Sequence, residues 1–108
     1  MNRVPDGVEL DVVIAADHPA FAGHFPGAPV LPGVVLLSLV MEALSAAPVL
    51  AGALGPVPCI DQVKFLAPVR PGQLLRIRVE ARSDGLSFEI RCAGSTVARG
   101  RMSAARLA

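Results

Sequence analysis

One apolar segment near the middle of the chain constrains the fold more than any other feature. In residues 18–60 the only formally charged side chain is Glu42, and residues 34–54 are almost continuously apolar. The run has the length of a membrane span, but Glu42 and Pro48 interrupt it, so we expect a buried helix instead. The helix should begin at residue 32 or 33, where proline and glycine favour a helix start, and end near residue 47.

Alternating apolar and polar residues on both sides of this helix predict β-strands. The expected strands are residues 8–14, 59–66, 74–82, 86–92 and 96–105. The sequence Ser83-Asp84-Gly85 is a strong hairpin signal between the third and fourth of them. Residues 48–58 are mostly small and are expected to form a loop.

A helix that is apolar nearly all round must be covered by other elements. The order of one strand, a long helix and four strands in an antiparallel meander therefore predicts an α+β architecture. In this architecture a curved, five-stranded antiparallel sheet wraps around one long apolar helix, which is the hotdog fold. We expect residues 1–108 to form a single domain. Because 53% of the residues are hydrophobic, part of the apolar surface should lie in a subunit interface.

Composition excludes several classes of function. The net charge is +1, there is no basic run, and the only aromatic residues are four phenylalanines, so nucleic acid is not an expected partner. No apolar leader precedes the first strand, and we expect a cytoplasmic protein without a membrane segment. Cys59 and Cys92 lack metal-ligand spacing and are expected to be small buried residues in a reducing compartment. Histidines and acids show no metal-ligand spacing either.

Two features can carry chemistry. Residues 23–33 contain three prolines and three glycines, and this stiff loop holds His24 directly before the helix. On the helix, Ser38, Glu42 and Ser45 fall at positions i, i+4 and i+7 and form one polar stripe. From the residues alone, the stripe either faces water or a polar interface, or lines a site opposite His24. The histidine is either structural or a catalytic base.

Two motifs resemble those of a known family. Residues 24–34, His-Phe-Pro-Gly-Ala-Pro-Val-Leu-Pro-Gly-Val, are similar to the signature of the 3-hydroxyacyl-acyl carrier protein dehydratases, which have the hotdog fold. Residues 63–72, Val-Lys-Phe-Leu-Ala-Pro-Val-Arg-Pro-Gly, resemble a second motif of that family, at the entry to its third strand. Together with the strand order, the resemblance covers nearly the whole chain.

The resemblance implies a mechanism. His24 would take a proton from C2 of a 3-hydroxyacyl thioester, which acyl carrier protein presents on its phosphopantetheine arm. The Gly33 N–H at the helix start would polarise the thioester carbonyl. A carboxylic acid on the helix would assist departure of the 3-hydroxyl as water. Each site would combine the histidine of one subunit with the acid of another, and no dissociable cofactor would be needed.

This chain departs from the family at the acid, because Ser38 occupies that position. A serine hydroxyl cannot supply a proton as a carboxylic acid does. Glu42 stands one helical turn further on, about 6 Å along the axis. A displacement of ~1 Å can already cost about 100-fold in rate, so replacement by Glu42 is demanding.

Three hypotheses follow. The chain is a dehydratase that uses His24 with Glu42, or a non-catalytic or half-catalytic subunit of a hotdog heterodimer, or an acyl thioesterase in which Glu42 and Ser38 activate water. In each case the partner subunit is either a second copy of the chain or another hotdog protein. The residues expected to contact the acyl thioester are Gly33, Val34, Val35, Leu39 and Phe65. The residues expected to meet the acidic carrier protein are Lys64 and Arg70.

Overall fold

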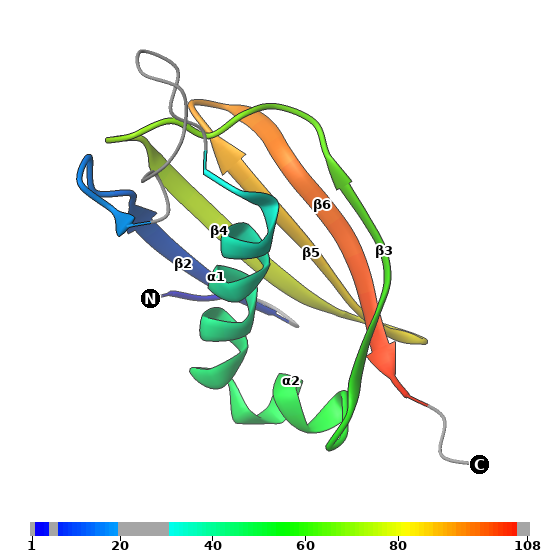
Figure 1. Cartoon of the computed structure of the whole chain (residues 1–108). Helices are drawn as coiled ribbons and strands as arrows, with labels where there is room; N and C mark the ends of the chain where they lie inside the picture. Colours follow the sequence, from blue (N-terminus) through cyan, green and yellow to red (C-terminus); the bar gives the residue numbers. More distant parts are fainter. Residues whose placement is uncertain (1, 5–6, 20–30, 106–108) are drawn as a thin grey trace.

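A computed structural model describes residues 2–4, 7–19 and 31–105 of the chain. A single antiparallel sheet of six strands curves around one long helix, α1 (Gly33–Ser45), as Figure 1 shows. The strands lie in the order β1-β2-β4-β5-β6-β3, and every neighbouring pair is antiparallel. The predicted wrapping of an antiparallel sheet around an apolar helix is therefore present, with one short strand added.

The strand boundaries follow the local alternation of side chains closely. The strands are β1 (Asn2–Val4), β2 (Gly7–Val13), β3 (Pro58–Phe65), β4 (Leu74–Arg82), β5 (Gly85–Cys92) and β6 (Ser95–Ala104). The last five agree with the predicted ranges to within one residue at each end. The strand β1 was not predicted, because three residues are too few to show an alternating pattern.

The predicted four-strand meander is wrong for β3. Strands β4, β5 and β6 do form a meander, but β3 pairs with β6 at one edge of the sheet, and β4 pairs instead with β2. The chain crosses from β3 to β4 through residues 66–73, which arch over one end of the sheet (Figure 1). The physical reason lies in burial. Leu75, Ile77 and Val79 of β4 are fully buried, as a central strand requires, whereas seven of the eight residues of β3 are exposed.

Helix α1 and a second, shorter helix follow one another on the same side of the sheet (Figure 1). Helix α1 packs against β2 and β4 through its buried residues Leu36, Val40, Ala43 and Leu44. Residues 48–58 were predicted to be a loop, but Pro48–Ala53 form a second short helix, α2. Proline at the first position of a helix loses no hydrogen bond, so Pro48 ends one helix and begins the next.

The core lies between the sheet and α1, and its burial corrects one further prediction. Leu75, Ile77 and Ile90 of the central strands are fully shielded from solvent. Cys92 belongs to the core as predicted, but Cys59 is exposed because it lies on the edge strand β3. Within the described ranges, neither helix is long and apolar enough to cross a membrane.

Candidate active site

An apolar groove opens where the start of α1 meets the end of β3. Its volume is about 500 Å³, and its lining is formed by two short segments, residues 31–33 and 65–69, together with Leu36 of α1. The lining residues are Leu31, Pro32, Gly33, Leu36, Phe65, Leu66, Ala67, Pro68 and Val69. A backbone hydrogen bond of 2.8 Å from the Leu31 N–H to the Val69 carbonyl ties the two segments together. The groove offers apolar contacts of the kind that an acyl chain needs.

The start of α1 presents backbone donors at this groove. Pro32 is the N-cap residue and provides no side-chain cap, and the first turn contains no acidic residue. The Val35 N–H donates to the Pro32 carbonyl at 3.0 Å, whereas no hydrogen bond within the described ranges uses the N–H of Gly33 or Val34. The first N–H groups of a helix have no partner inside the helix and carry a partial positive charge. Such a terminus can stabilise a carbonyl oxygen that becomes negative.

Phe65 lies directly over Gly33. A β-carbon at position 33 would be 2.6 Å from the ζ carbon of the Phe65 ring and within 3.0 Å of two further ring atoms. Only glycine therefore permits this approach of the ring to the helix start. Phe65 itself keeps half of its surface exposed, which leaves the groove open to solvent on that side.

The polar stripe of α1 points away from the sheet. Ser38, Glu42 and Ser45 are all exposed. The Ser38 hydroxyl donates to the Val35 carbonyl at 2.6 Å, and the Ser45 hydroxyl donates to the Glu42 carbonyl at 2.7 Å. Both hydroxyl protons thus serve the helix backbone. The stripe does not line the groove, so this single chain does not bring Ser38 or Glu42 to the helix start.

Only some of the residues predicted to contact the acyl thioester line the groove. Val34 is 72% exposed on the outer side of α1, and Val35 and Leu39 pack at the margin of the core. None of these three lines the groove, whereas Gly33 and Phe65 do. His24 lies outside the described residues.

Sequence reasoning missed most of the groove lining, including Leu31, Leu36 and Val69. All three are buried, and two of them fall within the two family motifs. The apolar residues of the two motifs were therefore the signal in the sequence that could have identified the groove.

The two proposed carrier-protein contacts lie in different surroundings. Lys64 is exposed on the side of β3 opposite the groove, and Arg70 is exposed directly after the buried Val69. The Arg70 N–H donates to the Gln73 side-chain oxygen at 2.7 Å. Within the described ranges, no three histidine, cysteine, aspartate or glutamate side chains gather as metal ligands would.

Comparison with known proteins identifies the family. A family model described as ApeI dehydratase matches residues 2–101. The chain belongs to the ApeI-like dehydratase family. This result confirms the relationship that the two sequence motifs indicated.

Curated relatives of this ApeI-like chain are dehydratases of the FabZ type. The 3-hydroxyacyl-[acyl-carrier-protein] dehydratase FabZ of Desulforamulus reducens is 39% identical over 71 residues, which are 62% of this chain and 50% of the relative. The FabZ of Chlamydia trachomatis serovar L2 (strain 434/Bu) is 38% identical over 109 aligned residues, covering 83% of this chain and 66% of the relative. The chain thus spans about half the length of most of the FabZ relatives that it matches.

Solved structures confirm the hotdog fold of the ApeI-like chain. The dehydratase heterocomplex ApeI:P from Xenorhabdus doucetiae superposes with a TM-score of 0.77 at 24% identity, covering 98% of this chain and 93% of the other. The R-hydratase PhaJ1 from Pseudomonas aeruginosa superposes with a TM-score of 0.62 at 17% identity, covering 99% and 88%.

Proposed function

We propose that this chain dehydrates 3-hydroxyacyl thioesters that are carried by acyl carrier protein. The observation that carries the proposal is the apolar groove, which ends at the uncapped start of α1 with Phe65 over Gly33. The groove would hold the acyl portion, and the Gly33 N–H would hold the thioester oxygen. FabZ relatives are dehydratases of such carrier-bound substrates, and this supports the choice of reaction.

The reaction balances without a cofactor. His24 removes the proton from C2, and the electrons of that bond form the C2–C3 double bond. The C3–O bond breaks, and the hydroxyl leaves as water with a proton from an acid. The products are the trans-2-enoyl thioester and water. The negative charge that develops on the thioester oxygen is stabilised by the helix start.

We propose that the acid comes from a second hotdog subunit. Ser38 cannot protonate the leaving hydroxyl, and Glu42 lies on the face of α1 that is turned away from the chain's own sheet. Exposed apolar side chains lie on α1, on α2 and on or next to the edge strand β3, and exposed apolar residues of this kind are typical of a subunit interface. They are Val34, Met41, Val49, Val57, Ile60, Phe65 and Leu66. In a homodimer, Glu42 of one subunit would serve the groove of the other.

A heterodimer is the alternative, and one similar structure is a dehydratase heterocomplex. In that case a different hotdog chain would supply the acid, and this chain would contribute the His24 half of one site. The purified chain would then be inactive alone and would gain activity with its partner.

Mixing two inactive variants tests the proposal. His24→Ala and Glu42→Gln should each abolish formation of the enoyl thioester. In a shared-site homodimer, exchanging subunits between the two variants should restore about a quarter of wild-type activity, because half of the dimers are mixed and each has one intact site. Activity of Glu42→Gln alone would exclude Glu42 as the acid. Release of free thiol without enoyl product would identify a thioesterase instead.

A further inference from the structure

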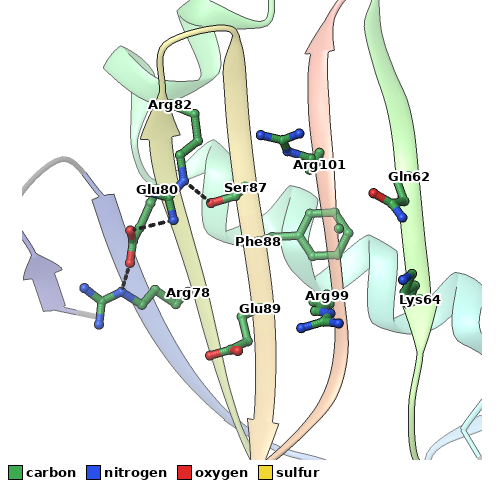
Figure 2. Close-up of a pocket in the computed structure, with 11 residues that line it drawn as sticks. Gln62, Lys64, Arg78, Glu80, Arg82, Ser87, Phe88, Glu89, Arg99 and Arg101 are labelled. Atoms are coloured by element: carbon green, nitrogen blue, oxygen red, sulfur yellow. Dashed lines mark hydrogen bonds and ion pairs between the residues drawn. The ribbon is translucent and has the colours of Figure 1, made fainter.

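A second hollow lies on the opposite side of the sheet from α1. Its volume is about 380 Å³, and it extends across β4, β5, β6 and β3 (Figure 2). Gly100 of β6 lies in its lining, and a β-carbon there would be 2.5 Å from the ζ carbon of Phe88. Because Arg99 and Arg101 point to the outer side of the sheet, a side chain at position 100 would point to the inner side, towards the buried Phe88.

The charges around this hollow are unevenly paired. On β4, Arg78 and Arg82 both form ion pairs with Glu80. On β5, Glu89 accepts a hydrogen bond of 3.0 Å from the Thr96 hydroxyl and lies 3.6 Å from Arg91. The carboxylates at the hollow are thus already engaged by neighbouring groups.

The other half of the hollow carries only cations and an amide. Arg99 and Arg101 project from β6, and Lys64 and Gln62 project from β3 (Figure 2). The three cations form no ion pair or hydrogen bond within the part of the chain that the structure describes. Arg99 has two register partners, Glu89 on β5 and Lys64 on β3, and the like charges of Lys64 and Arg99 directly opposite each other are destabilising. We infer that Lys64, Arg99 and Arg101 form a cationic face that is arranged for an external anionic partner.

The exposure of the cations distinguishes between kinds of partner. Lys64, Arg99 and Arg101 are all exposed, so water and salt weaken each of their attractions. One small anion would be held only weakly by such groups. Several carboxylates on a protein surface would gain from all of the cations together and would also be steered towards the hollow.

We propose that the cationic face formed by Lys64, Arg99 and Arg101 docks the acidic acyl carrier protein. This inference rests on the proposed function, which requires that a carrier protein present the substrate. The position suits delivery, because Lys64 and Phe65 are consecutive residues of β3 that face opposite sides of the sheet. The cationic face and the acyl groove therefore meet at the same end of one strand. Arg70, which does not line the hollow, is not part of this surface.

Charge neutralisation with a matched control tests this surface. The variant Arg99→Gln/Arg101→Gln should lower kcat/KM about tenfold for a carrier-bound 3-hydroxyacyl thioester, since each exposed charge contributes up to about 1 kcal/mol. It should leave kcat/KM unchanged for the same acyl group on N-acetylcysteamine, and the loss should shrink as salt is added. The control Arg70→Gln removes one exposed positive charge outside the hollow, as Lys64→Gln removes one within it, and should affect neither substrate.

Binding measurements separate failure of docking from failure of the proposed function. If the wild type turns over neither thioester, the proposed function fails, but binding of carrier protein without an acyl group still tests the surface. Lys64→Gln, as an independent single variant, should also weaken that binding. Unchanged carrier binding in both variants would overturn the inference. Saturable binding of inorganic pyrophosphate, lost in Arg99→Gln/Arg101→Gln while carrier binding is kept, would assign the face to a small anion instead.

Discussion

Replacing Gly33 with alanine tests how closely Phe65 covers the start of α1. Alanine is favoured over glycine in helices by up to about 1 kcal/mol, so the substitution alone should stabilise the protein. The new β-carbon, however, would lie 2.6 Å from the Phe65 ring, and the ring would have to move. Overpacking of this kind costs about 1–3 kcal/mol, and the lower end applies because half of the Phe65 surface is exposed. The two effects should nearly cancel in Gly33→Ala.

A double-mutant cycle isolates the contact. In a Phe65→Ala background the steric cost disappears, and Gly33→Ala should then stabilise the protein by about 0.5–1 kcal/mol. The free energies of unfolding, measured by urea denaturation of the four proteins, should therefore give a coupling energy of about 0.5–1 kcal/mol. An equal effect of Gly33→Ala in both backgrounds would show that the ring does not lie over Gly33. Gly33→Ala should also lower dehydratase activity more than Phe65→Ala does, because a displaced ring enters the groove.

Two further predictions concern glycines of β6 and of the second helix, and a third concerns pH. Gly100→Ala should destabilise the protein by about 1–3 kcal/mol in urea denaturation, because its β-carbon would meet Phe88 and neighbouring backbone. Gly52→Ala in α2 should instead stabilise the protein by up to about 1 kcal/mol in the same measurement, because a β-carbon there would meet nothing within 4 Å. A hydrogen bond from Arg76 lowers the pKa of Asp11, so this pair adds stability at neutral pH that is lost as pH falls through the lowered pKa. Asp11→Asn should therefore destabilise the protein at neutral pH but not in strong acid, and an equal loss of stability at both pH values, by thermal denaturation, would contradict the assignment.

Local patterns were sufficient to predict most of the secondary structure. The range of β4 was predicted without error, because its alternation is uninterrupted over nine residues. The start of α1 was predicted from the Pro32-Gly33 pair. These features depend on neighbours in the sequence, which act through backbone conformation and side-chain period.

Strand pairing could not be predicted in the same way. The sequence order suggested that β3 precedes β4 in a meander, but β3 lies at the far edge beside β6. Which strands pair depends on how the whole sheet covers α1, and that is a property of distant contacts. The exposure of Cys59 follows from this edge position and was mispredicted for the same reason.

For the candidate site, too, some features follow from the sequence and others depend on contacts between distant segments. The sequence by itself determined the family, the proline- and glycine-rich segment that contains His24 and the absence of an acid at position 38, since each is a statement about residue types at fixed spacing. Only the tertiary structure decided that Phe65 covers Gly33, because that contact joins the end of β3 to the start of α1. It also decided that Lys64 lies opposite Arg99, because an antiparallel register places side chains from distant segments on one side of the sheet.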